Sequence, residues 1–386
     1  MLIKHSWSES TSLSDVVIHR EHSESRSKRP TATMSTTTTT QTIVQGGGME
    51  ARTVKEPTGA TSFKEVPVID LSPMDGKDPA KLEELVSQVY DACTQVGFFY
   101  VKNHGISHET TENIKAQSAR FAKELPLEKK MELDRQYNEF HLGYGPYETE
   151  PRPGALRAHR FESFMIGREA QFDREYGSKV GTEQDANNQW PQEEDLPGFK
   201  ATVGSYFGDV LSLSRKLIQI IALSLKLDKT FFDDKLDRPG CLLSLNYYTE
   251  KAQESGANAS IAAHTDHELF TILLQSEGIK ALEVVNSEGY WVPAHPIPDT
   301  FVINIGDALA IWTNNVFLST LHRATNAGGV ERISVPFFFG ANYDTVMHTL
   351  PSCISETRPL KYKPVTAGEH YQMKMNSSYG KKGSTT

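Results

Sequence analysis

The chain has 386 residues, 38% of them hydrophobic, and a formal net charge of -9. This length and apolar content suffice for a buried core, so one large domain or two modest ones are expected. The acidic balance and the lack of a long basic cluster argue against nucleic acid or an anionic membrane as a partner. The composition therefore favours chemistry on a small molecule.

The three cysteines, Cys93, Cys241 and Cys353, are far apart, and none forms a Cys-x-x-Cys pair. This spacing argues against a disulfide framework or a thiolate metal site. The N-terminus lacks the features of a secretory signal, and no apolar run approaches the roughly 20 residues needed to span a bilayer. We therefore expect a cytoplasmic protein, and a monomer.

Residues 1–60 are rich in serine, threonine and charge and show no sustained hydrophobic period. Such a segment cannot bury enough apolar surface to offset the entropy lost on ordering, so a disordered low-complexity tail is expected. Three regions are predicted after it. Helices and strands span 61–180, a helical segment and a β-rich core span 181–345, and a C-terminal helix and tail span 346–386.

The first ordered element is predicted to be a short apolar strand at Val66–Asp70. Asp78 and Pro79 then supply a capping side chain and a preset φ, which are typical of a helix start. Apolar residues recur at three- and four-residue spacing after them, so a helix with one buried face is expected, ending at Gly97. Residues 98–101 have the composition of a buried strand.

A second long helix is predicted from Phe199 to Leu225, where apolar residues again recur at core spacing. Beyond Pro239 and Gly240 the chain changes to short β-rich segments separated by turn residues. Such closely spaced strands predict an antiparallel sandwich or barrel, such as a jelly roll. The predicted strands are residues 242–247, 270–275, 301–305, 308–312 and 333–339.

The main candidate for chemistry is a pair of potential ligands, His264 and Asp266, two residues apart. On an extended strand both side chains project from the same face and can bind one metal ion. His322 supplies a second imidazole after several intervening strands. Two histidines and one carboxylate leave metal positions open for a cosubstrate and O₂, which suits Fe(II).

A candidate anion site follows in the same part of the chain. Arg332 and Ser334 are two residues apart in a β-rich run, so their side chains are expected on one face. A guanidinium and a hydroxyl there can bind a carboxylate through charge-assisted, bidentate hydrogen bonds. The sequence therefore predicts a carboxylate site as well as a metal site.

These residues and several other segments resemble the isopenicillin N synthase-like group of Fe(II)- and 2-oxoglutarate-dependent dioxygenases. The matching segments are Val66–Asp70, Gly97–Gly105, Asn246–Tyr248, His264–Asp266, Asn304–Asp307, Ser319–Arg323 and Arg332–Ser334. A match over so much of the chain is far more specific than three ligands alone.

The resemblance implies a mixed α/β fold with an all-β core, a double-stranded β-helix (jelly roll) with flanking helices. It also implies that His264, Asp266 and His322 bind Fe(II). The implied enzyme hydroxylates or desaturates a small organic molecule with O₂ and releases succinate and CO₂, and ascorbate is a candidate reductant. The catalytic core would lie within 181–345.

The resemblance further implies that Arg332 and Ser334 bind the distal carboxylate of 2-oxoglutarate, with Tyr248 and, less directly, Asn246 assisting. The keto oxygen and near carboxylate of this cosubstrate would bind the iron. Phe270, Leu273 and Phe338 are expected to line the site. The aromatic stretch from Glu139 to Gly167, with Tyr144, Tyr147, Phe161 and Phe164, favours an apolar or aromatic substrate in specialised metabolism.

The chain departs from the usual family pattern at two places. Gly340–Asn342 stands where many relatives have Asn-Pro, and Met165 replaces a frequent aspartate. Both are expected near substrate walls. They leave the iron chemistry intact, but they prevent the transfer of any particular substrate.

Two other functions stay open at this point. In a cosubstrate-free oxidase like isopenicillin N synthase itself, Arg332 and Ser334 would bind a substrate carboxylate. The Asn246–Tyr248 element favours the 2-oxoglutarate users instead. A non-catalytic jelly-roll binding protein is a different class, and the intact set of candidate ligands argues against it.

Other histidines and aromatic residues near the candidate ligands are expected to have structural roles. His104 belongs to the fold signature and is not counted as a ligand. His267 follows Asp266 directly and should point away from the metal. Because side chains alternate along a strand, only one face of Phe337–Phe339 can reach the metal.

Overall fold

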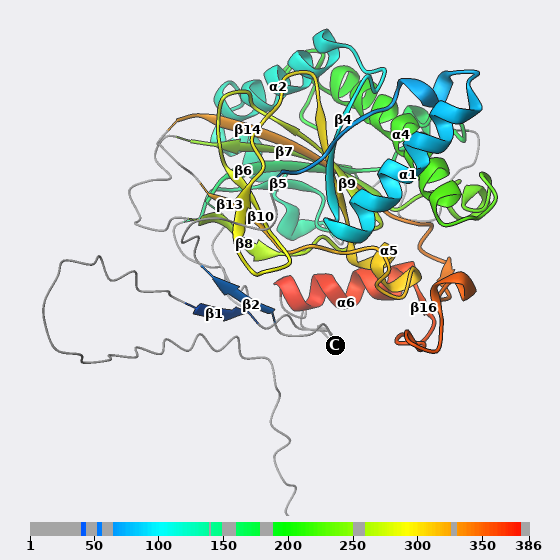
Figure 1. Cartoon of the computed structure of the whole chain (residues 1–386). Coiled ribbons are helices and arrows are strands. Elements are labelled where there is room, and N and C mark those ends of the chain that lie inside the picture. Colours follow the sequence, from blue (N-terminus) through cyan, green and yellow to red (C-terminus); the bar gives the residue numbers. More distant parts are fainter. Residues whose placement is uncertain are drawn as a thin grey trace, which may run out of the picture.

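A computed structural model describes residues 40–43, 52–55, 65–138, 140–148, 160–177, 188–249, 259–325 and 330–379. Its central feature is an eight-stranded sheet in which strands from both predicted regions, 61–180 and 181–345, lie side by side (Figure 1). In spatial order, the eight strands are β3 (Val68–Asp70), β4 (Phe98–Lys102), β12 (Phe301–Ile305), β9 (Phe270–Gln275), β14 (Arg332–Phe339), β7 (Cys241–Tyr248), β6 (Glu162–Gly167) and β5 (Gly143–Gly145). Only β3 and β4 pair in parallel.

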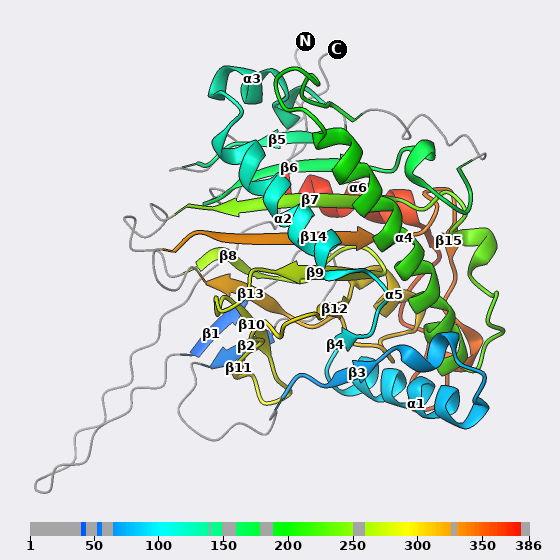
Figure 2. The same ribbon diagram turned by 90° about the horizontal axis from the view of Figure 1, so that it is seen from above.

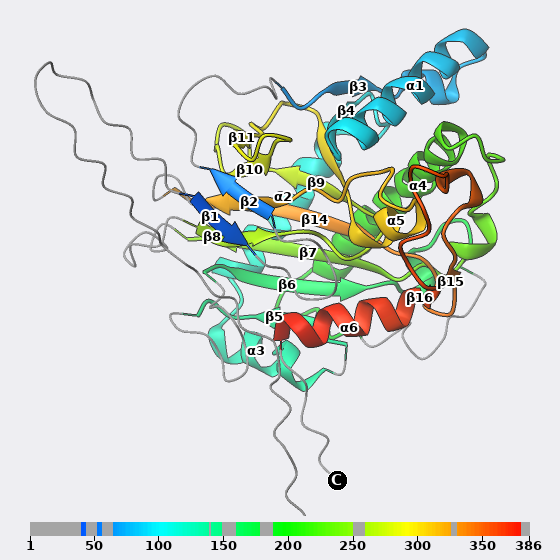
Figure 3. The same cartoon turned by 60° about the horizontal axis from the view of Figure 1, so that its bottom comes forward.

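A second, four-stranded antiparallel sheet lies against the inner face of the large one (Figure 3). In spatial order its strands are β11 (Trp291–Pro293), β10 (Leu282–Val285), β13 (His322–Thr325) and β8 (Ala259–His264). Together the two sheets form the predicted double-stranded β-helix, or jelly roll. Residues of both line one shared cavity.

Helices cover the outer face of the large sheet, where α2 and α4 cross its strands (Figure 2). This layer buries the main hydrophobic core. Both predicted long helices, α1 and α4, are confirmed. The helices are α1 (Pro79–Gln95), α2 (His108–Lys123), α3 (Leu127–Glu132), α4 (Phe199–Ser224), α5 (Asp307–Trp312) and α6 (Ala367–Tyr379). No described helix has the length and apolarity needed to cross a membrane.

The predicted boundaries of α1 have clear physical causes. The Asp78 carboxylate accepts a hydrogen bond from the Ala80 N–H at 3.1 Å and caps the helix, and Pro79 occupies the first turn. The chain then reverses at Gly97, whose φ is +75°. A Cβ there would lie 2.2 Å from the Leu318 carbonyl oxygen, so only glycine allows β4 to start so close to this loop.

The strand predicted at residues 308–312 is wrong, because this segment forms α5. A short, wholly apolar run has no period that distinguishes a buried strand from a buried helix. The helix begins after Gly306, and the carboxylate of Asp307 lies in its first turn, where negative charge is stabilised. Asp307 is in turn held by tertiary contacts that the sequence does not reveal.

The two ends of the chain are described only in part. Within residues 1–60, β1 (Thr40–Ile43) and β2 (Arg52–Lys55) form an antiparallel pair. The other residues of this segment lie outside the described ones, so its disorder stays a prediction. The region 346–386 contains the short strands β15 (Val346–Met347) and β16 (Val365–Thr366), followed by the predicted C-terminal helix, α6.

A buried ion triad joins the segment after β6 to α4. Asp173 accepts two hydrogen bonds from Arg215, at 2.7 and 2.8 Å, and one from Arg168 at 3.0 Å. Burial alone would raise the pKa of Asp173. The guanidinium of Arg215, helped by that of Arg168, outweighs burial and lowers this pKa to about 2. The carboxylate is inaccessible to solvent, so salt screens the interaction little.

We expect Asp173 to make the free energy of unfolding depend on pH. Its pKa falls from about 3.9 in an unfolded chain to about 2. The carboxylate therefore stabilises the fold by about 2–3 kcal/mol at neutral pH, and this contribution is lost as the pH falls from about 5 towards 2. Asp173→Asn should lower stability at neutral pH by about 3–5 kcal/mol, because two guanidiniums stay buried.

Urea unfolding across this pH range measures both effects. The acid-induced loss of stability should be larger in the wild type than in Asp173→Asn. Equal losses in the two proteins would contradict the assignment.

Candidate active site

A cavity of about 230 Å³ lies between the two sheets. The large sheet contributes side chains from β6, β7, β9, β12 and β14, and the small sheet contributes side chains from β8, β10 and β13. All seven predicted site residues line this one cavity: His264, Asp266, His322, Arg332, Ser334, Tyr248 and Asn246.

The three predicted metal ligands converge at one end of the small sheet. His264 ends β8 and His322 begins β13, and the two residues are paired partners. Asp266 lies in the loop that follows β8. Its Oδ1 lies 3.5 Å from the Nε2 atom of each histidine. Among the described residues this is the only group of three or more His, Cys, Asp or Glu side chains close enough to share a metal ion.

Neighbouring groups fix the orientation of these ligands. Each imidazole Nδ1 contacts a backbone carbonyl two residues earlier in the chain, at 2.8 Å for His264 and 3.1 Å for His322. The Oδ2 atom of Asp266 accepts hydrogen bonds from the Thr271 hydroxyl and from the Asn304 amide, the latter at 2.7 Å. Two Nε2 atoms and one carboxylate oxygen therefore face a common point, and this donor set fits Fe(II).

The ligand group also has an unusual electrostatic character. Burial works to raise the pKa of Asp266, but the adjacent His322 and His264 hold it well below its usual range. Burial works to lower the pKa of His322, and Asp266 raises it instead. The buried carboxylate therefore stays charged and favours a cation between the imidazoles.

A buried carboxylate behind the metal loop connects it to the C-terminal helix. Asp307 Oδ1 accepts a hydrogen bond from Ser319 at 2.6 Å, and its Oδ2 accepts one from Thr265 at 3.1 Å. Lys374 of α6 lies 2.9 Å from the same Oδ2, and both side chains are buried. Thr265 lies between two ligands and Ser319 precedes the third. Lys374 therefore helps to hold both ligand segments in place.

We expect Lys374→Met to weaken Fe(II) binding by roughly 10- to 100-fold, the usual effect of losing an outer partner of a metal site. Anaerobic Fe(II) titration measures this affinity. Gln372→Ala, on the exposed side of α6, is the control. A folded Lys374→Met protein with the wild-type Fe(II) affinity would contradict this role.

The predicted carboxylate site is built by two paired strands. Arg332 of β14 pairs with Tyr248 of β7, and Ser334 pairs with Asn246. The Arg332 guanidinium lies 4.6 Å from the centre of the Tyr248 ring, a cation–π contact. The Asn246 amide donates to Ser334 Oγ at 3.4 Å and accepts from Ser244 at 2.7 Å. The register thus places all four predicted side chains on one face.

Two polar groups at this site have no hydrogen-bond or ion-pair partner within the described part of the chain. The guanidinium of Arg332 is buried, with 3% of the residue exposed, and has no ion-pair partner there. The hydroxyl of Tyr248 is also buried and has no hydrogen-bond partner there. Burying such groups is costly unless a ligand satisfies them. The cavity therefore fits an anionic ligand beside the metal ligands.

Comparison with known proteins agrees with this geometry. Residues 66–193 match the family described as non-haem dioxygenase in morphine synthesis N-terminal, and residues 239–341 match the 2OG-Fe(II) oxygenase superfamily. The chain belongs to the 2OG-Fe(II) oxygenase superfamily. It is a non-haem iron dioxygenase that uses Fe(II), 2-oxoglutarate and O₂, as predicted.

Individual relatives cover most of this dioxygenase. The 2-oxoglutarate-Fe(II) type oxidoreductase hxnY of Emericella nidulans is 32% identical over 82% of this chain and 90% of its own. A homoarginine-6-hydroxylase of Glycine max is 34% identical over 83% of this chain and 99% of its own. A full-length Neurospora crassa protein, solved as a crystal structure in complex with alpha-KG and thymine, has 27% sequence identity to this chain. The two structures match with a TM-score of 0.71 over 81% of this chain and 97% of that one.

The walls of the cavity confirm some sequence predictions and correct others. Leu273, Phe338 and Met165 line the cavity of the dioxygenase as predicted. Phe270 does not. It belongs to the core and contacts Phe339 with ring centres 5.0 Å apart. Side chains alternate along β9, so Leu273 and Phe270, three positions apart, point to opposite faces.

The structure also places the aromatic stretch and Gly340–Asn342, the first departure from the family pattern. Phe161 lines the cavity, whereas Tyr144 and Phe164 pack in the core beneath α2 and α4. Part of this stretch lies outside the described residues. Gly340–Asn342 does not line the cavity, because Asn342 instead binds Asp237 and the segment at Arg238. The expectation of a substrate wall there is wrong.

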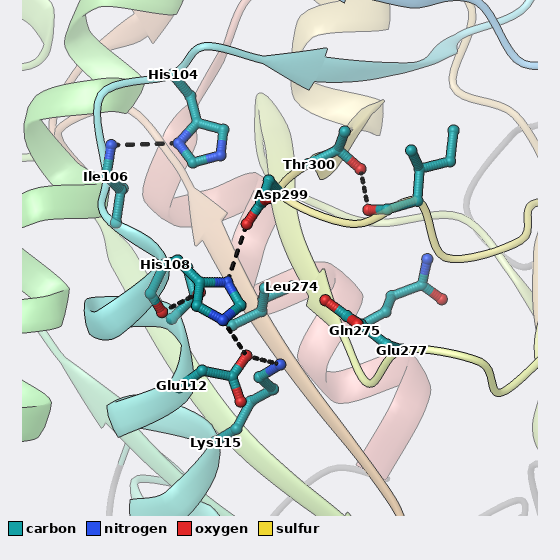
Figure 4. Close-up of a pocket in the computed structure, with 12 residues that line it drawn as sticks. His104, Ile106, His108, Glu112, Lys115, Leu274, Gln275, Glu277, Asp299 and Thr300 are labelled. Carbon is teal, nitrogen blue, oxygen red and sulfur yellow. Dashed lines mark hydrogen bonds and ion pairs between the residues drawn. The ribbon is translucent and has the colours of Figure 1, made fainter.

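A second, much smaller cavity of about 20 Å³ lies away from the metal ligands, at the start of α2 (Figure 4). His104 lines it, packs on Phe301 at 4.5 Å between ring centres and accepts a hydrogen bond from the Ile106 N–H at 3.2 Å. Its position agrees with the structural interpretation of His104. His108 bridges Asp299 and Glu112 at the surface nearby.

Sequence reasoning missed several residues that hold the site together. Thr271 and Asn304 bind the outer oxygen of Asp266, and Lys374 anchors Asp307. Asn304 and Asp307 belong to one recognised segment, Asn304–Asp307, which signals importance but not a role. Lys374 lies in the C-terminal helix and carries no motif.

Proposed function

We propose that His264, Asp266 and His322 bind the Fe(II) of this dioxygenase, and that Arg332 and Ser334 bind the distal carboxylate of 2-oxoglutarate. The observation that carries the second part is the buried Arg332 guanidinium, which lines the same cavity as the three ligands and has no ion-pair partner among the described residues. A dicarboxylate between them would satisfy both centres.

The protein's own groups then have distinct tasks. Arg332 orients the cosubstrate through a bidentate ion pair, and Ser334 donates a hydroxyl to the same carboxylate. Tyr248 offers a hydroxyl that is otherwise unpaired, and Asn246 holds Ser334 in place. Thr271 and Asn304 donate hydrogen bonds to the second carboxylate oxygen of Asp266, which would leave the first oxygen for the metal. Iron, when bound, supplies the oxidising chemistry with O₂, releasing succinate and CO₂ from the cosubstrate.

The substrate is proposed to be a small organic molecule with an apolar body. The cavity volume is about 230 Å³, and apolar side chains from both sheets line it, including Phe161, Met165 and Phe338. Apolar walls exclude water, so the few polar groups of the cavity determine how the ligand is oriented. Relatives named for oxidation of homoarginine or for binding of thymine support a small substrate. Hydroxylation or desaturation in specialised metabolism is the proposed outcome.

Anaerobic titration of the Fe(II)-loaded protein with 2-oxoglutarate tests this proposal. The expected result is a weak visible metal-to-ligand charge-transfer band that saturates with cosubstrate. Iron binding without such a band would overturn the cosubstrate assignment and support the cosubstrate-free oxidase. Absence of iron binding would overturn the ligand assignment.

A monomeric state and a cytoplasmic location are proposed as well. The three cysteines are all free and buried, which supports a reducing environment. Light scattering of the purified protein measures the oligomeric state, and imaging of a tagged chain measures the location.

A further inference from the structure

A second side chain of the C-terminal helix, besides Lys374, reaches the loop that carries Asp266. His370 lies one helical turn before Lys374 on α6, so both side chains project from the same face, and the two residues are 2% and 7% exposed. Nε2 of His370 lies 3.0 Å from the backbone oxygen of His267, the residue that follows Asp266. The buried face of α6 therefore contacts the metal-binding loop directly.

This contact determines which ring nitrogen of His370 carries the proton. A carbonyl oxygen only accepts hydrogen bonds, so Nε2 is the donor. The other nitrogen, Nδ1, is buried and has no hydrogen-bond partner among the described residues. Burial and the nearby Lys374 ammonium lower the pKa of His370. The ring is therefore neutral at neutral pH and offers a single donor, which the His267 carbonyl accepts.

The loop that His370 contacts has no regular structure of its own. Residues 265–269, which follow β8, form neither helix nor strand. Their carbonyl groups instead accept hydrogen bonds from the first turn of α5. The Asp307 N–H donates to the Asp266 oxygen at 2.8 Å, and the Ala308 N–H donates to the His267 oxygen at 3.1 Å. The His267 oxygen thus accepts one hydrogen bond from α5 and one from α6, and the shape of the loop depends on both helices.

The start of α6 is fixed away from the metal-binding loop. Thr366 and Glu369 form a capping box, in which the Glu369 carboxylate accepts from the Thr366 N–H at 3.0 Å and the Thr366 hydroxyl accepts from the Glu369 N–H at 3.1 Å. The Gly368 N–H donates to the Tyr343 oxygen at 2.9 Å. Beyond this start the helix runs next to α5 (Figure 1). A change at His370 therefore leaves the beginning of the helix in place.

His370 and Lys374 act on different parts of the metal centre. Lys374 acts through the Asp307 carboxylate, whereas His370 acts on the main chain beside Asp266. Both contacts come from one face of one helix, so both form when the helix docks and both are lost when it undocks.

We propose that His370 is a positioning residue of the metal centre, and that docking of α6 is thermodynamically coupled to Fe(II) binding. This inference rests on the proposed ligand set and goes further by assigning a role to the C-terminal helix. With the helix docked, the His267 carbonyl is fixed and Asp266 is held facing the two histidines. An undocked helix releases that carbonyl, so the metal binds more weakly. Coupling is reciprocal, so bound metal must stabilise the docked helix by the same factor.

Anaerobic Fe(II) titration of the full chain tests the positioning role. His370→Leu removes the donor but keeps a buried apolar side chain, so it should bind Fe(II) roughly tenfold more weakly or worse, as expected for loss of an outer partner. His370→Gln supplies an amide donor and should recover most of this loss. His348→Leu, at an exposed histidine, is the matched control and should bind as the wild type does.

Hydrogen–deuterium exchange tests the coupling itself. In the wild type, saturation with Fe(II) should slow amide exchange in α6 by roughly tenfold or more. His370→Leu should reduce this slowing by the same factor by which it weakens Fe(II) binding, because both effects measure one coupling free energy. Urea unfolding of the metal-free proteins, measured alongside, separates this effect from a general loss of stability.

Three outcomes would overturn the inference. They are wild-type Fe(II) affinity in His370→Leu, an affinity of His370→Gln as weak as that of His370→Leu, and exchange in α6 that Fe(II) leaves unchanged. Should His370→Leu fail to fold, His370→Gln and exchange in the wild type still decide the question. Absence of Fe(II) binding by the wild type would instead refute the proposed ligand set.

Discussion

Asp266→Asn should abolish succinate formation and lower Fe(II) affinity by more than roughly a hundredfold, which exceeds the usual effect of losing an outer partner. The amide keeps the shape of the side chain. However, Thr271 and Asn304 both donate hydrogen bonds to Oδ2 of Asp266. The amide oxygen of the variant should therefore occupy that place, with the NH₂ group facing the metal site. An NH₂ group cannot replace an anionic ligand.

Anaerobic Fe(II) titration and a succinate assay measure this prediction. Asp75→Asn, at an exposed carboxylate near Lys216, is the matched control and should behave as the wild type. Thr271→Val should fall between the two, with roughly a 10- to 100-fold weaker Fe(II) affinity. Succinate formation retained in Asp266→Asn would refute the proposed ligand set.

Arg332→Met should raise the Kd of 2-oxoglutarate by roughly a hundredfold or more, because a buried charge-assisted pair is worth about 3 kcal/mol. Methionine preserves much of the apolar stem that packs on Tyr248, but removes the charge and both donors. Fe(II) affinity should stay near the wild-type value, since Arg332 does not contact the three metal ligands. The charge-transfer titration reports the cosubstrate Kd, and Fe(II) titration reports the metal.

Two further variants sharpen this test. Arg332→Lys keeps the charge but loses the planar fork, so its Kd should lie between those of the wild type and Arg332→Met. Tyr248→Phe removes one hydroxyl and should raise the Kd by roughly tenfold at most. Arg120→Met, at an exposed ion pair with Glu124, is the control. A wild-type Kd in Arg332→Met would contradict the proposal that Arg332 binds 2-oxoglutarate.

The chemistry of the site could be predicted from sequence because it depends on residue types at short spacing. Arg332 and Ser334 are two apart on a strand, so they must share a face wherever the strand lies. His264 and Asp266 are also two apart, although β8 ends at His264 and Asp266 occupies the following loop. The long helices were predictable for the same reason, since Asp78 and Pro79 act within one turn.

Where local patterns were ambiguous, tertiary contacts decided the structure. The apolar run at 308–312 fits a strand or a helix equally well, and Asp307, bound to Ser319 and Lys374, favours the helix. Phe270 is an apolar aromatic residue, as expected for a cavity wall. However, the register of β9 turns it towards the core, and a shift of one residue would reverse this.

The metal and cosubstrate chemistry could be predicted without a structure, because those residue types and spacings leave few alternatives. The groups that surround these residues depend on tertiary contacts. His370 and Lys374 both lie well after the last metal ligand in the chain, and neither belongs to a motif. They reach the site because helix packing brings distant segments together, and local sequence carries no record of such packing.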